Sequence, residues 1–146
     1  MLHPAQLGHA GQVNDLRHAA QALGDPQPGI GGPGDQLRLR VLGTGLVESA
    51  YAAALAIELG DRGLVFARDV PIEGMYRGLP LGVAFRADFV VQGCLLVQVK
   101  AVDALTDAHR AQLLSCLRVS DIKLGLLINF HAFPVVKGIH RVVNKL

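Results

Sequence analysis

Polar side chains within β-rich runs of the sequence are the residues best placed to carry out chemistry. Asp88 lies in the run Arg-Ala-Asp-Phe-Val-Val, and Gln98 and Lys100 lie in the run Leu-Leu-Val-Gln-Val-Lys. A buried carboxylate or ammonium group is costly unless it is paired or bound to a metal ion. Gln98 and Lys100 are two residues apart, so they share one face of their strand. These three side chains are the first candidates for a functional site.

The length of the loop at Gln92-Gly93 decides whether Asp88 meets the other two residues. In an antiparallel pair, opposed residues share a face, and their residue numbers have a constant sum. A two-residue loop sets Asp88 opposite Val97, on the wrong face, whereas a three-residue loop or a bulge sets it opposite Gln98. A functional site therefore predicts the longer loop. The alternative is an ordinary ion pair between Asp88 and Lys100 near the end of the sheet.

A further carboxylate comes from a predicted helix. Glu48 follows a break at Gly43 and Gly45 by one turn, and Tyr51 lies three residues further on the same side of that helix. A helix-borne carboxylate beside a strand-borne one forms a hard-oxygen site, which Mg²⁺ accepts together with water and substrate phosphate. The residues thus predict a hard-oxygen site for Mg²⁺ at Asp88 and Glu48.

The elements that must position these residues follow from hydrophobic periodicity and turn signals. The break at 42–45 precedes a firm helix that ends at Leu59, and Leu46, Ala50, Ala53 and Ile57 are expected on its buried face. Thr106 and Asp107 are candidate N-caps of a second helix that runs to about Val119 and buries Leu113, Leu114 and Leu117. Strands are expected over residues 64–70, 79–85, 87–91, 95–99, 124–130 and 135–143. This order predicts an α/β sandwich with a mixed sheet and helices on its faces.

The chain divides at a Pro/Gly-rich stretch. Residues 24–34 read Gly-Asp-Pro-Gln-Pro-Gly-Ile-Gly-Gly-Pro-Gly, which cannot hold a helix or a central strand and is predicted to be a linker. Residues 1–34 are expected to form an extension with one short helix at Gln12–Leu23, and residues 35–146 to form the working domain. The domain carries 13 basic and 10 acidic side chains, so any basic face belongs to it.

Composition narrows the class of protein. The 146 residues are 51% hydrophobic and 18% charged with a net charge of +2, which suits one compact domain. The longest charge-free apolar stretch, Leu124–Val136, has 13 residues, whereas a membrane-spanning helix needs about 20. No secretory signal is recognised, and Cys94 and Cys116 are expected to be reduced, so a cytoplasmic protein without a membrane partner is predicted. His131 and His140 have no partner at metal-ligand spacing.

Five segments resemble the GxxExxY proteins, a branch of the PD-(D/E)XK nuclease superfamily. The signature residues are Gly45, Glu48 and Tyr51, within Leu-Gly-Thr-Gly-Leu-Val-Glu-Ser-Ala-Tyr at 42–51. The likeness continues, in the family's order and spacing, through segments 86–91, 98–102, 109–114 and 125–130. It covers essentially residues 36–146 and leaves the first 34 residues outside.

The resemblance implies a restriction-endonuclease-like fold and a set of site residues. Asp88 would be the main metal ligand, Glu48 a second carboxylate, and Gln98 the residue in the second ligand position. Lys100 would orient the attacking water or stabilise charge on the phosphate. Gln112 matches the glutamine of the RecB-like helix motif, and we expect it, His109 and Tyr51 to line the substrate side.

The resemblance includes three departures from the family pattern. Gln98 stands where the family usually has Glu, although related nucleases of the Mrr type carry Gln-x-Lys; Cys116 replaces a Tyr, and Thr44 a common Pro. The expected function is a Mg²⁺-dependent endo- or exonuclease, a hydrolase acting on DNA. The alternative is a catalytically impaired protein of this fold that binds nucleic acid or a protein partner. An assembly role, with residues 12–23 presented to a partner, and a homo-oligomer are also left open.

Overall fold

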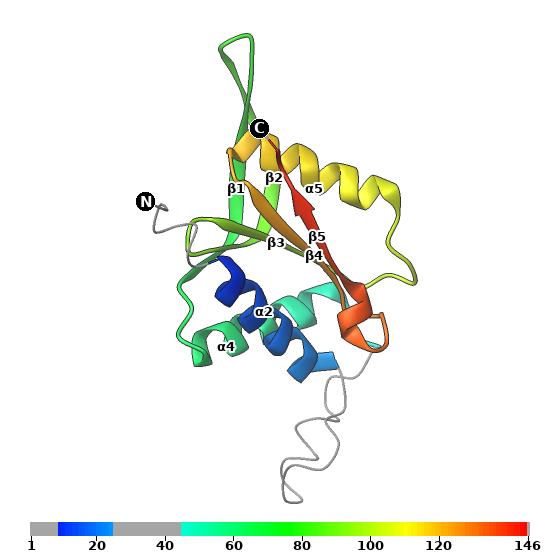
Figure 1. Cartoon of the computed structure of the whole chain (residues 1–146). Helices are drawn as coiled ribbons and strands as arrows, with labels where there is room; N and C mark the ends of the chain where they lie inside the picture. The colour runs from blue at the N-terminus through cyan, green and yellow to red at the C-terminus, as the bar shows by residue number, and fades with distance from the viewer. Residues whose placement is uncertain (1–8, 25–44, 146) are drawn as a thin grey trace, which may run out of the picture.

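A mixed five-stranded sheet is the centre of the molecule. The computed structural model describes residues 9–24 and 45–145. Within them, the sheet has the order β1-β2-β3-β4-β5 (Figure 1). Its strands are β1 (Phe66–Tyr76), β2 (Leu79–Val91), β3 (Leu95–Lys100), β4 (Leu124–Asn129) and β5 (Ile139–Val143). Strands β3 and β4 pair in parallel and the other neighbours are antiparallel, which confirms the predicted mixed sheet.

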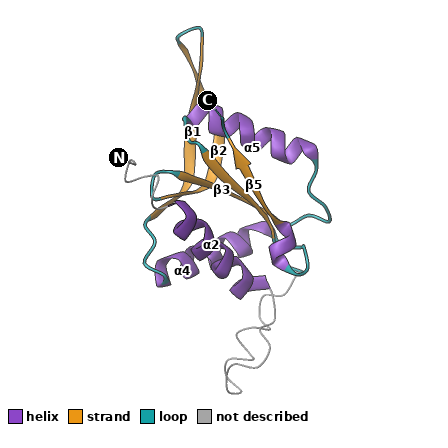
Figure 2. Ribbon diagram, viewed as in Figure 1, coloured by secondary structure: helices purple, strands orange, loops and turns teal. Residues whose placement is uncertain are grey.

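Helices cover both faces of this sheet. Helices α2 (His9–Gly24) and α4 (Glu48–Asp61) lie on one face, and α5 (Asp107–Ser120) lies on the other (Figure 2). Each face has its own apolar cluster, because alternate residues of β3 and β4 point to opposite sides. Val97 and Leu126 belong to the α4 side, and Leu96 and Leu127 to the α5 side. The predicted α/β sandwich is confirmed.

Helix α2 packs onto the same core as the sheet. The predicted helix at Gln12–Leu23 is extended by a few residues, and its Leu16, Ala19 and Ala20 are fully buried. These side chains belong to the cluster that also contains Tyr51 and Leu55 of α4. The apolar face of α2 is therefore covered by its own chain. The boundary drawn at residue 34 stays a prediction, as the Pro/Gly-rich stretch lies outside the described residues.

The buried face of α4 differs from the one predicted. Tyr51, Leu55 and Leu59 are fully buried, whereas Ile57 is 66% exposed and Ala53 is also exposed. Tyr51, Leu55 and Leu59 face the interior because they bury more apolar area than the alanines of this helix would. The helix begins at Glu48 after Val47, whose side chain makes no capping bond. Of the break predicted at 42–45, residues 42–44 lie outside the described residues.

The first hairpin is longer than predicted. Strands 79–85 and 87–91 form one continuous strand, β2, which pairs with β1 along most of its length. Arg77 and Gly78 both have positive φ, 51° and 74°, as a two-residue hairpin turn with the twist of the strands requires. The hairpin tip projects from the body of the molecule (Figure 1) and exposes Met75, Tyr76 and Leu79.

The second half of the chain follows the prediction with one correction. Thr106 is the N-cap of α5, and Leu113, Cys116 and Leu117 are its buried residues, whereas Leu114 is half-buried. Strand β4 is buried along its whole length. The strand predicted at 135–143 is wrong in its first half, because residues 135–138 form a 3₁₀ turn in which Lys137 N–H donates to the Pro134 carbonyl.

Gly138 fits this turn because it has no side chain. A Cβ atom there would lie 2.3 Å from the carbonyl oxygen of Asn129 and 2.7 Å from Cβ of Ala132. We expect Gly138→Ala to lower the free energy of unfolding by about 1–3 kcal/mol, the usual cost of overpacking. Urea denaturation measures this loss. Gly60→Ala in α4 is the matched control: its Cβ would meet nothing within 4 Å, so stability should rise by up to about 1 kcal/mol. Equal effects of both substitutions would contradict the prediction.

The two cysteines are unpaired, as predicted. Cys94 Sγ lies 3.4 Å from Oε1 of Gln12, whereas Cys116 is buried in α5 on the other face of the sheet. Burial raises the pKa of the Cys116 thiol to about 12, so this thiol stays protonated at neutral pH. In the described part of the chain, no helix is long and apolar enough to cross a membrane.

Candidate active site

The register of the β2–β3 hairpin brings Asp88 opposite Gln98. Phe89 pairs with Val97 and Val91 with Leu95, so the connection has three residues and not two. Gln92 and Gly93 hold the left-handed conformation of this turn, with φ of 54° and 69°. The longer loop that a functional site requires is therefore confirmed.

Side chains replace the backbone ladder where β2 and β3 part. The backbone pairing ends at Phe89 and Val97. One step further, Val99 N–H donates to Oδ2 of Asp88 over 2.7 Å, and Asp88 N–H donates to Oε1 of Gln98 over 3.2 Å. The Asp88 side chain thus bonds the backbone of β3, and the Gln98 side chain bonds the backbone of β2.

The charge of Asp88 is held in a partly desolvated place. Burial raises the pKa of its carboxyl group above the ordinary value, and the Val99 N–H opposes that rise. The charge of Glu48 raises the pKa further, while the ammonium group of Lys100 lowers it. Glu48 and Lys100 are therefore both close enough to act on Asp88 electrostatically. A cation beside Asp88 would offset the cost of burial and the repulsion by Glu48, and it would therefore favour the ionised carboxylate.

Asp69 is a third acidic residue near this place, and the sequence interpretation missed it. Its charge also raises the pKa of Asp88. In the register of β1 on β2, Arg68 lies opposite Phe89 and Val70 lies opposite Ala87. Asp69 and Asp88 are therefore neighbours on adjacent strands. Asp69 has a φ of 50°, which is uncommon for a residue with a side chain inside a strand. A charged residue within a predicted strand was the signal that could have found it.

Tyr51 fixes the chain just before Glu48. Its hydroxyl accepts a hydrogen bond from Leu46 N–H over 3.2 Å, and its ring stacks on Phe130 with 4.7 Å between centroids. The His131 Nε2 atom lies 2.9 Å from the Leu46 carbonyl oxygen. Tyr51 is fully buried, so the structure places it beneath the start of α4 and gives it no exposed surface for a substrate. Glu48 itself is exposed, in the first turn of α4.

Asn129 clamps the segment that follows Lys100. Its amide group bonds both backbone groups of Val102, over 3.1 and 2.9 Å, and its oxygen also accepts from His131 N–H. Phe130 N–H donates to the Lys100 carbonyl over 2.9 Å. Lys100 and Asn129 are register partners on β3 and β4. The half-buried Lys100 therefore leaves the sheet at a fixed point, close to Gln98 on the same face.

The two predicted residues of α5 lie at the beginning of that helix. His109 takes part in a capping box: its N–H donates to Oγ1 of Thr106, and its Nδ1 accepts from Thr106 N–H. Gln112 is exposed one turn further along. Their contact with a substrate stays a prediction.

The donor atoms at this place fit a hard divalent cation. Glu48, Asp88 and Gln98 offer two carboxylates and an amide oxygen, and Mg²⁺ uses one or two carboxylates and keeps several waters. In the described ranges, no group of three or more His, Cys, Asp or Glu side chains is close enough to hold a metal ion.

Comparison with known families agrees with the fold. A model of the PD-(D/E)XK nuclease superfamily matches residues 39–142, so the chain belongs to this superfamily. Members of this superfamily are hydrolases that generally use divalent metal ions. No curated protein and no solved structure gives a significant match. The matched region contains Glu48, Asp88, Gln98 and Lys100 and excludes helix α2.

Proposed function

We propose that this protein is a divalent-metal-dependent nuclease that hydrolyses DNA phosphodiester bonds, and that it belongs to the GxxExxY branch of its superfamily. The observation that carries the proposal is the junction of β2 and β3, where the Asp88 carboxylate bonds the backbone of β3 and the Gln98 amide bonds the backbone of β2. The charges of Glu48 and Lys100 act on the same carboxylate. An acid pair, an amide oxygen and an amine at a strand junction are the chemistry that phosphodiester hydrolysis needs.

Each residue has a separate role in this proposal. Asp88, Glu48 and Gln98 would hold Mg²⁺ or Mn²⁺, which supplies Lewis-acid polarisation of the phosphate when bound. Lys100 lies on the face of β3 that also carries Gln98, and its ammonium group orients the attacking water or stabilises charge on the phosphate. Tyr51 is a positioning residue, because its hydroxyl and ring fix Leu46 and hence the start of α4.

The direct test is cleavage of linear, circular and single-stranded DNA by purified protein with Mg²⁺ or Mn²⁺. We expect Lys100→Ala to reduce the cleavage rate at least about 100-fold, the usual loss when one stabilising donor is removed. Lys145→Ala is the matched control, as Lys145 is an exposed lysine near the chain end, away from the strand junction. Equal cleavage by wild type and Lys100→Ala would show that another protein cuts the DNA.

A second candidate function follows from Gln98. This residue is only 8% exposed, and its oxygen already accepts a hydrogen bond from Asp88 N–H. An amide brings one negative charge less than the glutamate usual at this position, and metal affinity in hard-oxygen sites follows ligand charge. The alternative is therefore a protein that binds nucleic acid, or a protein partner, without cutting.

A further inference from the structure

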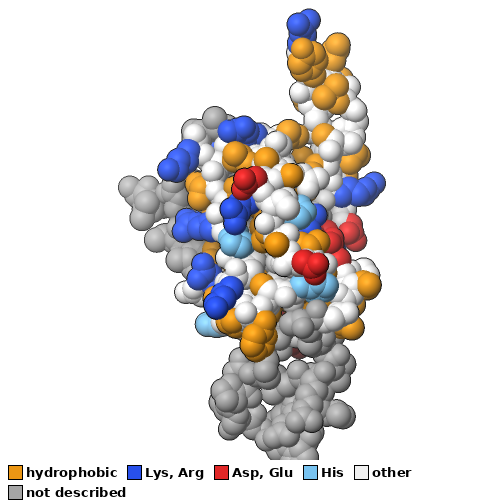
Figure 3. Space-filling view, turned by 90° about the vertical axis from the view of Figure 1, so that its right-hand side faces the viewer, with side chains coloured by type: hydrophobic (Ala, Val, Ile, Leu, Met, Phe, Trp, Pro, Cys, Tyr) orange, Lys and Arg blue, Asp and Glu red, His pale blue; other side chains and the backbone are white. Residues whose placement is uncertain are grey.

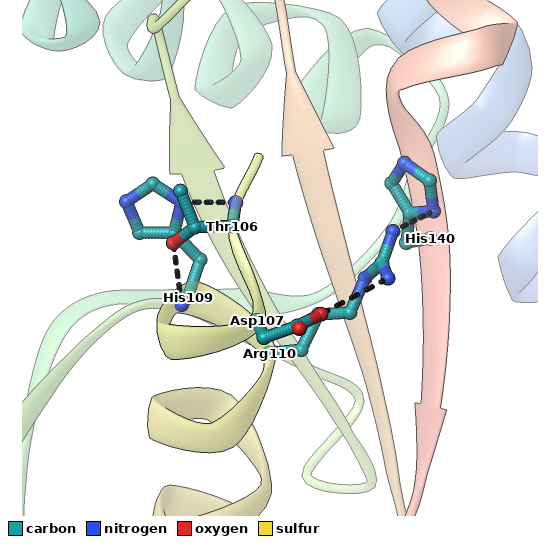
Figure 4. Close-up of polar contacts among 5 residues, drawn as sticks. All are labelled: Thr106, Asp107, His109, Arg110 and His140. Atoms are coloured by element: carbon teal, nitrogen blue, oxygen red, sulfur yellow. Dashed lines mark hydrogen bonds and ion pairs between the residues drawn. The ribbon is translucent and has the colours of Figure 1, made fainter. Parts of the chain in front are cut away.

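Arg110 and His140 come together from two elements on the α5 side of the sheet. Nη2 of Arg110 lies 3.4 Å from Nδ1 of His140, and Figure 4 shows the guanidinium group extending from α5 toward the ring on β5. A guanidinium group has donors only, so Nδ1 of His140 is the acceptor in this contact. The neutral ring then carries its proton on Nε2. The pair thus offers one positive charge on a guanidinium group that the imidazole ring positions.

The charge of Arg110 is not neutralised by a buried partner. The carboxylate that pairs with it among the described residues is Asp107, whose Oδ1 lies 3.9 Å from Nη1. The Asp107 side chain is fully exposed and that of Arg110 is 48% exposed, so the pair contributes little. Burial and the positive charge of Arg110 both lower the pKa of His140, which agrees with a neutral ring.

The strand register places this pair beside the strand junction. Gln98 pairs with Leu127, and Leu127 pairs with His140, so Gln98 and His140 point to the same face of the sheet. Two strand spacings separate them, or about 10 Å between their backbones. Along a stacked DNA strand, phosphates follow one another about every 3.4 Å of the helix axis. Successive phosphates lie on the outside of the helix and are further apart than this axial rise, so a strand with one phosphate at Gln98 brings another, about one or two nucleotides away, near His140.

We infer that Arg110 and His140 form a phosphate-binding subsite for the DNA backbone. Arg110 binds the phosphate, and His140 positions the guanidinium group by accepting its hydrogen bond at Nδ1. Lys, Arg and His side chains are spread over this side of the molecule, with Asp and Glu side chains among them (Figure 3). The inference rests on the proposed function, because it takes DNA as the ligand.

Binding of a fluorescein-labelled duplex of about 20 base pairs tests the subsite. Anisotropy is measured in EDTA, so that no cleavage occurs, over a series of NaCl concentrations. We expect Arg110→Ala to weaken binding about tenfold and to reduce the slope of log K against log salt by about one. His140→Ala should weaken binding less and leave the slope unchanged, because it removes the acceptor that positions the guanidinium group and removes no charge. Arg118→Ala, from the last turn of the same helix, is the control for loss of one charge.

The outcomes separate this inference from the proposed function. The subsite is supported if the wild type binds the duplex, if Arg110→Ala binds it more weakly than Arg118→Ala does, and if Arg110→Ala also shows a smaller slope of log K against log salt. Equal affinities and slopes for these two arginine variants would overturn the subsite and leave the nuclease proposal intact. A wild-type protein that unfolds cooperatively on heating, and is therefore folded, but binds no DNA would instead overturn DNA as the ligand, and the subsite with it.

Discussion

Asp88→Asn is expected to abolish DNA cleavage and, in the absence of metal, to make the protein more stable at neutral pH. Burial raises the pKa of the Asp88 carboxyl group, so its ionised form is less favourable in the folded chain than in the unfolded chain. Asparagine removes that charge and keeps an oxygen to accept from Val99 N–H. The loss of a carboxylate ligand should reduce the cleavage rate at least about 100-fold.

The sign of the pH dependence makes this prediction specific. The unfavourable charge is fully present above the raised pKa and fades as the pH falls below the unfolded-state pKa of about 3.9, because Asp88 then becomes protonated in both states. Thermal unfolding in EDTA should therefore show a gain for Asp88→Asn at pH 7 that disappears at pH 3. Asp103→Asn removes an exposed carboxylate and is the control for the general effect of one charge. A lower midpoint than the wild type at pH 7, or a gain that persists at pH 3, would contradict the prediction.

Much of the fold could be predicted because local signals agree with the tertiary structure. The turns at Arg77-Gly78 and Gln92-Gly93, the cap at Thr106 and the apolar run of β4 all carry short-range information. The buried face of α4 was predicted wrongly, because Tyr51 meets Phe130 from the far side of the chain, a contact that periodicity does not contain. The 3₁₀ turn at 135–138 was missed for a similar reason, since Gly138 packs on the Asn129 carbonyl group.

The candidate site could be predicted in its strand residues and less well around them. Parity arguments were enough to link Asp88 with Gln98 once a loop length was assumed. Asp69 reaches them only through the pairing of β1 with β2, where a residue with positive φ interrupts the ladder. Arg110 and His140 are 30 residues apart, and only the docking of α5 over β5 joins them. Lone histidines carry no spacing signal from which such a pair can be foreseen.

Gln98→Glu is expected to raise the affinity for Mg²⁺ or Mn²⁺ about tenfold or more. A glutamate oxygen can accept from Asp88 N–H as the amide does, and it adds the negative charge on which hard-oxygen affinity depends. In EDTA the variant should be less stable than the wild type, because the charges of Glu48 and Asp69 already act unfavourably on Asp88. Calorimetric titration with Mn²⁺ measures the affinity. A tenfold tighter constant adds about 1.4 kcal/mol to the stabilisation by saturating metal.

The same variant separates the two candidate functions. If the wild type cleaves DNA and Gln98→Glu cleaves at lower metal concentration, the amide is a working ligand of weaker charge. If the wild type does not cleave DNA and Gln98→Glu gains metal-dependent cleavage, the natural protein binds without cutting, because its site lacks only one negative charge. Gln92→Glu adds the same charge at the exposed turn before β3 and should leave the metal affinity unchanged. An unchanged or lower affinity in Gln98→Glu would mean that residue 98 joins the strands and holds no metal, because a ligand position responds to added charge and a purely structural one does not.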